Sequence, residues 1–411
     1  MRFDTGIIGG GPAGYTLAMR LASCGKNVVL FEKDKLGGTC LNRGCIPTKS
    51  LLHSSEMYAQ LSKFPSFGID VEVKKFDFSK IAEKRDLTVE KIRKSLEVAV
   101  KNSGVNVVYA EATIFDDNTI LANGEEYKVD KLIVATGSKP KELKGLEFDG
   151  NFILNSNDVL NLNELPKSVL IVGSGAIGIE WARIFSNFGV EVVILEKAEH
   201  LVPCADIEVS KRVERIFKQK KIKYYLNDSI VSIQDREVKL ISGEVIVPDI
   251  ILVAVGRTPE KIAFEKLETI GDAAGQIQLA HYAIHQAILL SKNENLALNR
   301  NFIPSVIYGI PEIAWVGLRE QDCDETFQKV ILPITALGKA WCDDETEGFI
   351  KLITKNDYIV GAHIVSKEAS ALIHQLLIAM QHNITVSELK RTCFAHPTYS
   401  EGVFEALCRL T

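Results

Sequence analysis

The sequence lacks the features that mark several large classes of protein. No apolar run is long enough to form a membrane-spanning helix. Lys and Arg together number 48 against 53 Asp and Glu, with no long basic block, which argues against a nucleic-acid surface. There is no charged leader or cleavage site at the start, and the eight cysteines are scattered except for one close pair. We therefore expect a cytoplasmic protein without membrane or nucleic-acid partners rather than a disulfide-stapled secreted one.

An internal repeat organises the chain, which at 411 residues is long enough for two or three domains. Each copy has a short apolar strand, the pattern G-x-G-x-x-G, a helical stretch and a second apolar strand that ends in an acid. The motif glycines are Gly9, Gly11 and Gly14 in the first copy and Gly173, Gly175 and Gly178 in the second. The acids are Glu32 and Glu196, at the same spacing from the first glycine in both copies.

This spacing has a physical meaning. The first glycine makes the turn from strand to helix, the second lets the backbone approach a pyrophosphate, and the third lets helix and strand pack closely. The acid accepts hydrogen bonds from a ribose. Each copy also closes with a buried strand that reaches a glycine, at Thr136-Gly137 and at Gly256. A single G-x-G-x-x-G is usually only a turn, but two copies in register predict two dinucleotide-binding modules.

The close pair of cysteines, Cys40 and Cys45, follows the first acid-tipped strand. In a straight helix two such residues are too far apart for a disulfide, so either none forms or the backbone is distorted, which Gly44 permits. Pro47 suits a first helical turn, so we expect a helix from near Cys45 to about Gln60. Cys45 then lies at the positive end of the helix, which favours its thiolate. A metal pair or two packed cysteines are the alternatives; metal is disfavoured because no second Cys or His pair occurs at ligand spacing.

The stretch G-G-T-C-L-N-R-G-C-I-P-T-K around these cysteines resembles the redox signature of the pyridine nucleotide–disulfide oxidoreductases, and of their dihydrolipoamide dehydrogenase branch in particular. The resemblance covers nearly the whole chain and ends in A-H-P-T-Y-S-E at 395–401. It implies an α/β fold with two Rossmann-like dinucleotide-binding domains and a C-terminal α+β dimerisation domain. The expected boundaries are 1–145 with 260–296 for FAD, 146–259 for NAD, and 297–411 for the interface.

The resemblance also implies roles for individual residues. Cys40 would be attacked by a dithiol substrate, and Cys45 would face the flavin beside Lys49, which pairs with Glu180. His396 would act as base on the partner subunit's disulfide, oriented by Glu401. The cofactor-binding residues would be the motif glycines with Glu32, Lys49, Thr136, Gly137, Glu196, Gly256, Asp272 and Ala280.

The implied activity is oxidation of protein-bound dihydrolipoyl groups with NAD⁺ through the cysteine pair and FAD. The implied partners are a second copy of the chain and a lipoyl-bearing acyltransferase or lipoyl protein of a 2-oxo acid dehydrogenase or glycine cleavage complex. Glu196 favours NAD over NADP because its charge repels a 2′-phosphate, and the nearest Arg after it is Arg212. Two alternatives stay open: another NAD(P)H-dependent disulfide reductase of the family, or a degenerate, non-catalytic subunit of a 2-oxo acid dehydrogenase complex.

One segment departs from the family pattern. Between Pro259 and Gly271 the chain is shorter than the family's, which there carries an apolar strand running into the Gly-Asp turn. The remaining residues can cross between domains, but we expect that they cannot also supply that strand. We therefore expect a break or a disordered crossing around residues 260–270.

Overall fold

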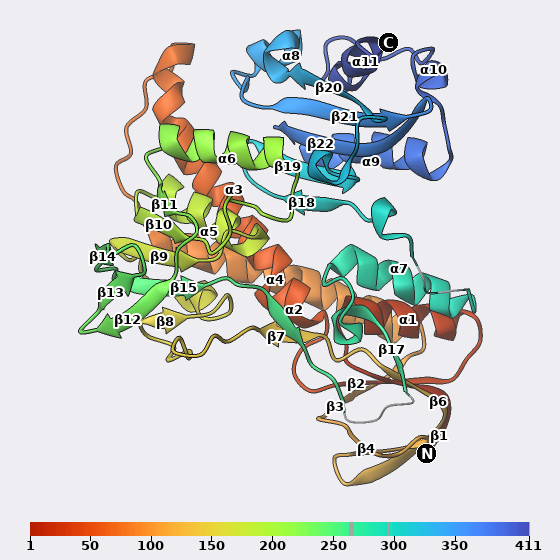
Figure 1. Ribbon diagram of the computed structural model, residues 1–411. Helices are drawn as coiled ribbons and strands as arrows, with labels where there is room; N and C mark the ends of the chain where they lie inside the picture. The colour runs from red at the N-terminus through yellow and green to blue at the C-terminus, as the bar shows by residue number, and fades with distance from the viewer. Residues whose placement is uncertain (263–266, 295, 297, 411) are drawn as a thin grey trace.

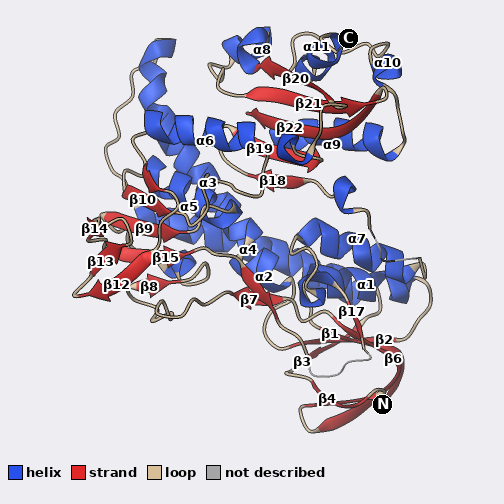
Figure 2. Cartoon of the chain, viewed as in Figure 1, coloured by secondary structure: helices blue, strands red, loops and turns tan. Residues whose placement is uncertain are grey.

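The computed structural model describes residues 1–262, 267–294, 296 and 298–410. Over these residues three large sheets follow one another along the molecule, each with helices packed against it (Figure 1; Figure 2). The N-terminus lies at the end formed by the first sheet, and the C-terminus lies in the part formed by the last (Figure 1). Within these described ranges no helix is both long and apolar enough to cross a membrane.

The first sheet forms from the first repeat. Its elements are β1 (Arg2–Ile8), β2 (Val28–Glu32), β3 (Asn106–Tyr109), β4 (Thr113–Asp116), β5 (Thr119–Ala122), β6 (Glu125–Val134) and β17 (Glu268–Thr269), with helices α1 (Pro12–Ser23) and α7 (Ala280–Ser291). The order is β3-β2-β1-β6-β5-β4, with β17 also paired to β6. β1, β2, β3 and β6 are parallel. β2 is buried along its whole length because both faces are covered: helices α1 and α7 lie side by side across one face (Figure 1), and apolar residues of β4, β5 and β6 pack on the other.

The second sheet forms in the same way from the second repeat. Its elements are β8 (Ile153–Leu154), β9 (Ser168–Val172), β10 (Glu191–Leu195), β11 (Lys223–Tyr225) and β15 (Ile250–Val253), with helices α5 (Ala176–Asn187) and α6 (Ile207–Gln219). The parallel order is β11-β10-β9-β15-β8. A small antiparallel sheet of β12 (Ile230–Gln234), β13 (Glu237–Leu240) and β14 (Val245–Ile246) accompanies it.

The third sheet is antiparallel and belongs to the C-terminal part. Its elements are β18 (Ser305–Ile307), β19 (Glu312–Gly317), β20 (Gln328–Pro333), β21 (Phe349–Lys355) and β22 (Tyr358–Ser366), with helices α8 (Gly338–Cys342), α9 (Ala369–Gln381), α10 (Val386–Leu389) and α11 (Glu401–Cys408). The order is β18-β19-β22-β21-β20. The predicted fold class, two parallel-sheet modules followed by an α+β part, is confirmed.

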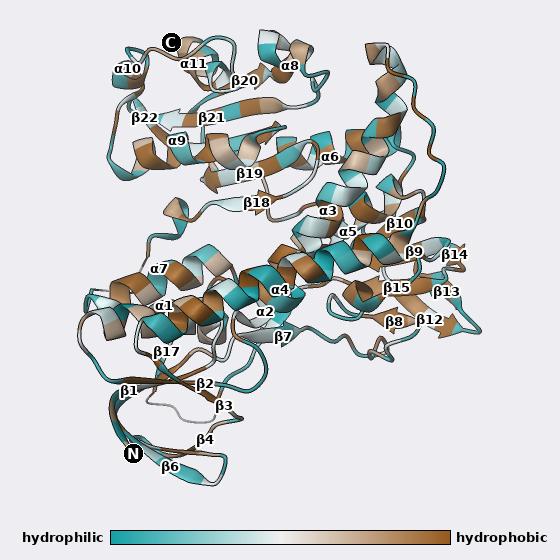
Figure 3. Ribbon diagram, turned by 180° about the vertical axis from the view of Figure 1, so that it is seen from behind, coloured by the Kyte–Doolittle hydropathy of each residue, from teal (hydrophilic) through white to brown (hydrophobic). Residues whose placement is uncertain are grey.

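Helices between β2 and β3 link the first module to the second. They are α2 (Gly38–Arg43), α3 (Cys45–Gln60) and α4 (Phe78–Asn102). α3 packs on both α4 and α5, and teal and brown residues are mixed along the length of α4 (Figure 3). The apolar side chains of α4 are buried at Phe78, Ala82 and Val89, as an amphipathic helix requires. Short 3₁₀ turns complete the chain at η1 (Leu61–Phe67), η2 (Val159–Asn161), η3 (Gly271–Ala274), η4 (Arg300–Phe302), η5 (Glu320–Asp322) and η6 (Ile334–Ala336).

The return from the second module to the first corrects one expectation. β16 (Arg257–Pro259) pairs antiparallel with β7 (Ser138–Pro140), which anchors the crossing. The short connection does supply a strand before Gly271, because β17 pairs in parallel with the end of β6. Two residues suffice, since the next amide, Ile270 N, continues the pairing by donating to Val134 O at 2.9 Å. The expected break around 260–270 falls in part on residues 263–266, which lie outside the described residues.

A buried ion pair joins the second module to the C-terminal sheet. Lys351 on β21 donates to Asp206, the N-cap residue of α6, at 2.6 Å and also contacts Glu320. Both Lys351 and Asp206 have no exposed side-chain surface. His363 lies opposite Lys351 on β22, and burial lowers the pKa of His363 to about 4. Lys351 therefore carries its charge into the interior only because carboxylates meet it there.

Candidate active site

The two glycine motifs form matching cradles. Gly9 and Gly173 have φ of +110° and +101°, and a Cβ on either would collide with the carbonyl oxygen of the closing strand. The third glycine of each motif is also required: a Cβ on Gly14 or Gly178 would come within 2.0 Å of the first glycine's carbonyl oxygen.

The middle glycine differs from its neighbours. A Cβ on Gly175 would meet no atom within 4 Å, and one on Gly11 would meet only Gly38 Cα, at 3.9 Å. Each middle glycine also caps a helix, α1 or α5. Each module thus leaves open the backbone position, at a helix N-terminus, where a pyrophosphate needs access. The residues present therefore fit a dinucleotide at both cradles.

The acid of each repeat is held in place by its own motif. Glu32 accepts from Gly10 N and Asp34 N, both at 2.8 Å. Glu196 accepts from the Ser174 amide at 2.8 Å and from the Ser174 hydroxyl at 2.6 Å. These bonds fix each carboxylate at the end of its strand, beside the cradle, where the spacing predicted a ribose contact.

Asp272 lies where the two modules meet. It accepts from the Ser138 hydroxyl at 2.6 Å, and the same hydroxyl accepts from Arg257 Nε at 2.7 Å. The closing residues Thr136 and Gly137 hold the crossing chain: Thr136 donates to Glu260 O at 2.5 Å, and Gly137 O accepts from Glu260 N at 2.9 Å. Ser138 and Arg257 were missed by the sequence reasoning, although both flank motif positions.

Two further cofactor candidates take their predicted places in the backbone. Gly256 has φ of +101°, and a Cβ there would meet no atom within 4 Å. Ala280 is the first residue of α7. Their contact with a cofactor stays a prediction.

The cysteine pair lies across a break between two helices. α2 ends at Arg43 and α3 begins at Cys45, with Gly44 between them at φ −140° and ψ −109°. A Cβ on Gly44 would lie 3.0 Å from the Thr39 carbonyl oxygen, so the close approach of the two helices favours glycine there. The expected helix from Cys45 to Gln60 is confirmed. Both cysteines are half-buried free thiols.

The two thiols are electrostatically unequal. A hydrogen bond from the Cys40 thiol, and next the charge of Lys49, lower the pKa of Cys45 to about 7 against the opposing effect of burial. The same hydrogen bond, with burial, raises the pKa of Cys40 well above its ordinary range. In the dithiol state Cys45 therefore becomes the thiolate as the pH rises through about 7, and Cys40 stays protonated.

Lys49 and Glu180 form the expected ion pair between α3 and α5. Lys49 Nζ lies 2.9 and 2.8 Å from the two carboxylate oxygens of Glu180. Glu180 is almost completely buried, and it also accepts from the Tyr308 amide at 3.1 Å. Lys49 Nζ lies 4.7 Å from the centre of the Tyr308 ring. Cys40, Cys45, Lys49 and Glu180 therefore form one cluster.

His396 and Glu401 form a second group in the C-terminal part. His396 Nδ1 lies 2.8 Å from Glu401 Oε1, and the His396 side chain is 77% exposed. The Thr398 amide and then His396 hold the pKa of Glu401 below its ordinary value, so Glu401 is a carboxylate that fixes one face of the imidazole. The His396–Pro397 peptide bond is cis.

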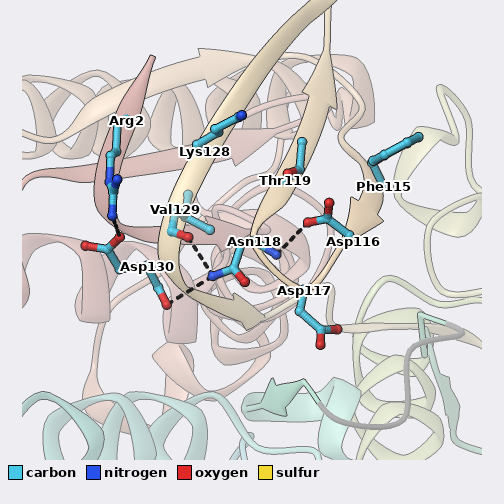
Figure 4. A pocket seen from close by; sticks show the side chains of 9 residues that line it. All are labelled: Arg2, Phe115, Asp116, Asp117, Asn118, Thr119, Lys128, Val129 and Asp130. Atoms are coloured by element: carbon cyan, nitrogen blue, oxygen red, sulfur yellow. Dashed lines mark hydrogen bonds and ion pairs between the residues drawn. The ribbon is translucent and has the colours of Figure 1, made fainter.

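A hollow elsewhere holds none of the predicted site residues. It has a volume of about 620 Å³ and lies at the β4–β5 hairpin and the middle of β6 (Figure 4). Arg2 pairs with Asp130 at 2.8 Å on its wall, and Asn118 donates to the Val129 carbonyl. The polar groups around it thus largely satisfy one another, and nothing in the hollow resembles the cysteine site.

Comparison with protein families assigns both parts of the chain. Residues 3–287 match the family described as pyridine nucleotide-disulphide oxidoreductase. Residues 303–407 match the dimerisation domain of the same family.

Similar proteins are found among curated sequences and solved structures. A dihydrolipoyl dehydrogenase of Bacillus subtilis is 32% identical over 464 aligned positions, covering 98% of this chain and 97% of that protein. One from Geobacillus stearothermophilus is 33% identical, covering 98% and 95%. The structure of LpdA from Mycobacterium tuberculosis has a TM-score of 0.91 at 23% identity, covering 99% of this chain and 100% of that one. The structure of the flavoprotein disulfide reductase RclA from Escherichia coli, titled as HOCl-induced, has a TM-score of 0.87 at 24% identity, covering 99% and 100%.

Proposed function

Since this chain belongs to the pyridine nucleotide-disulphide oxidoreductase family, we propose that it is a dihydrolipoyl dehydrogenase. It is an FAD- and NAD-dependent enzyme that oxidises dihydrolipoyl groups through a redox-active cysteine pair. The observation that carries this function is the cluster of Cys40, Cys45, Lys49 and Glu180. It places a thiolate of low pKa at the start of α3, which belongs to the module with the first cradle and packs on α5 of the module with the second. Curated dihydrolipoyl dehydrogenases similar along nearly the whole chain support the substrate class.

The chain's own residues account for the handling of thiols and protons. His396 of one subunit, with its other nitrogen held by Glu401, takes a proton from the dithiol of a substrate bound at the cysteine pair of the other subunit. The resulting thiolate attacks Cys40 of the oxidised pair, forming a mixed disulfide as the Cys40–Cys45 bond breaks. Cys45 leaves as a thiolate, stabilised by Lys49 and the helix end. The second substrate thiol then displaces Cys40, so the substrate becomes a disulfide and the pair a dithiol.

Bound FAD would supply the redox chemistry that links the reduced cysteine pair to hydride transfer to NAD⁺. The first cradle with Glu32 and Asp272 would hold FAD, and the second with Glu196 would hold NAD. Lys49 and Glu180 would bound the space next to Cys45. Over the full cycle a dithiol and NAD⁺ yield a disulfide, NADH and one proton.

The domain boundaries and the partners are part of the proposal. The three sheets support a division into 1–145 with 260–296, 146–259 and 297–411. The match of residues 303–407 to a dimerisation domain supports a homodimer. A lipoyl-bearing protein of a 2-oxo acid dehydrogenase or glycine cleavage complex is the proposed physiological substrate, and the cytoplasm the proposed compartment.

The proposed function predicts the properties of the purified protein. We expect a yellow protein with a flavin absorption spectrum that reduces NAD⁺ in the presence of dihydrolipoamide, because both cradles are open at the middle glycine. The measurements are the visible spectrum and NADH formation followed by absorbance. A colourless protein that stays inactive after addition of FAD would instead favour a non-catalytic subunit.

Cofactor choice gives a second prediction. We expect kcat/KM for NAD⁺ to exceed that for NADP⁺ by roughly 100-fold, about 2.7 kcal/mol of transition-state stabilisation. The carboxylate of Glu196 is fixed by Ser174, so it cannot move away from a 2′-phosphate. Arg212, the nearest Arg after it in sequence, is held 2.7 Å from Glu347.

Steady-state rates with each nucleotide measure this preference. Glu196→Gln, which removes the charge and keeps an acceptor oxygen, should reduce the ratio of kcat/KM for NAD⁺ to that for NADP⁺. A preference of the wild-type chain for NADP⁺ would contradict both the role of Glu196 and the dihydrolipoyl assignment.

A further inference from the structure

Arg183 is buried next to the active-site residue Glu180 and binds the chain between Tyr308 and Pro311. Arg183 lies on α5, one helical turn after Glu180, and only 3% of its surface is exposed. Its Nη1 donates to Tyr308 O at 3.1 Å and to Pro311 O at 2.7 Å. Burial lowers the pKa of Arg183 to about 10, against the opposing effect of nearby carboxylates. The buried guanidinium therefore keeps its charge at neutral pH, and two backbone carbonyl oxygens accept hydrogen bonds from it.

The backbone between Tyr308 and Pro311 leaves room for the guanidinium at Gly309. Gly309 has φ of +136°, and a Cβ there would lie 2.1 Å from Arg183 Nη1. Any other residue at 309 would thus displace the arginine head as well as strain the backbone. Gly309 and Arg183 are a matched pair, one making the space that the other fills.

Tyr308, which Arg183 binds through its carbonyl group, also contacts two residues of the active site. The Tyr308 amide donates to Glu180 at 3.1 Å, the Tyr308 carbonyl accepts from Arg183, and Lys49 Nζ lies 4.7 Å from the Tyr308 ring centre. Glu180 and Arg183 thus hold the two peptide groups on either side of Tyr308. If Tyr308 moved, Glu180 would lose a hydrogen bond from the Tyr308 amide, and Lys49 would lose its cation–π contact with the Tyr308 ring.

We propose that Arg183 is a positioning residue for the redox site: by fixing Tyr308, it holds the Lys49–Glu180 pair in the place where Lys49 acts on Cys45. This inference rests on the proposed function, since it concerns the thiolate of the same cysteine pair. Arg183 is not placed to touch a substrate, because its side chain is buried and engaged with Tyr308 and Pro311.

The electrostatic consequence has a definite sign. Lys49 lowers the pKa of Cys45, whereas Glu180 raises it. If Tyr308 is released, Lys49 is held less closely and the thiolate loses stabilisation, so the Cys45 midpoint moves to higher pH. The ionisable groups that act electrostatically on Cys45 or it on them are Cys40, Lys49, Glu180, Arg257 and Tyr308.

The test uses the full-length, FAD-loaded protein and the long-wavelength absorbance of its reduced form, which reports the Cys45 thiolate. In the wild-type protein this band should disappear as the pH falls through about 7. In Arg183→Met the midpoint should rise by about 0.5 unit or more, and kcat should fall roughly tenfold with KM for dihydrolipoamide little changed.

A second variant and a control separate positioning from general weakening. Gly309→Ala displaces the guanidinium but keeps its charge, so it should shift the midpoint in the same direction. The double variant should shift it no further than Arg183→Met alone, because both act through one contact. The control is Arg212→Met, which removes another arginine that joins the second module to the C-terminal part, through Glu347. It should lower the melting temperature and leave the midpoint in place.

The outcomes are distinct. A wild-type chain without the band or without dihydrolipoamide oxidation defeats the proposed function. With the wild-type band present, an unchanged midpoint in Arg183→Met, or an equal shift in Arg212→Met, overturns the positioning role. If Arg183→Met does not fold, the midpoint of Gly309→Ala decides in the same way.

Discussion

Replacing Cys45 with serine should remove the long-wavelength band of the reduced, FAD-loaded protein, whereas replacing Cys40 with serine should retain it. The reason is the unequal charge of the two sulfurs: the pKa of Cys45 is lowered to about 7, and that of Cys40 is raised. A serine at position 40 can still donate a hydrogen bond to the Cys45 thiolate. Both variants should lose dihydrolipoamide oxidation by at least roughly 1,000-fold, because neither can form the disulfide.

An exposed cysteine provides the control for this pair of variants. Cys24, which caps the end of α1, is exposed, and Cys24→Ser should change neither the band nor the rate. The measurements are anaerobic reduction followed by visible absorbance, and NADH formation under saturating substrate. If Cys45→Ser kept the band and Cys40→Ser lost it, the roles assigned to the two cysteines would be reversed.

Mixing two inactive variants should restore activity, because we propose that His396 completes the active site of the partner subunit. His396→Gln alone is expected to lower kcat by roughly 100- to 10,000-fold, the range for loss of a general base. When His396→Gln and Cys40→Ser subunits exchange at random, about half of the dimers are mixed and each holds one intact site, so about a quarter of the normal sites return. The prediction is based on the His396 imidazole, which is exposed and whose Nδ1 contacts Glu401.

The controls for the mixing experiment are internal. Each variant mixed with itself should stay inactive, and exchange is verified by native mass spectrometry of subunits that differ in mass. Glu401→Gln should lower the rate less than His396→Gln, because the ring stays in place and only its carboxylate partner is lost. Verified exchange without recovery of activity would place His396 in the site of its own subunit.

The parts that the sequence predicted best are those imposed by backbone geometry over short range. The first and third glycines of each motif are required by clashes with atoms that lie within the same βα unit or its closing strand, and the middle glycine leaves the helix N-terminus open, so their spacing alone reveals the cradle. The start of α3 at Cys45 follows from Gly44 and Pro47 in the same way. The pairs Lys49–Glu180 and His396–Glu401 came from the resemblance, because nothing local in the sequence brings α3 and α5 together.

The contacts that the sequence did not predict join residues far apart in the chain. Arg183 was visible as a charge within an apolar helix, but its partners Tyr308 and Pro311 lie more than a hundred positions away. The strand before Gly271 was wrongly judged impossible because its length was taken from the family; pairing with β6 needs only two residues. Ser138, which connects Arg257 to Asp272, has no sequence signal other than its place after Gly137.

The charges buried between α6 and β21 bear on how the molecule assembles. Lys351 comes from β21 and Asp206 from the N-cap of α6, so each charge meets its partner only when the C-terminal sheet is docked on the second module. Replacing Lys351 with an apolar residue would leave Asp206 in the interior without its cation, at a cost of about 3–5 kcal/mol. The contact of Lys351 with Asp206 and Glu320 thus ties the burial of these charges to the docked arrangement of the two parts.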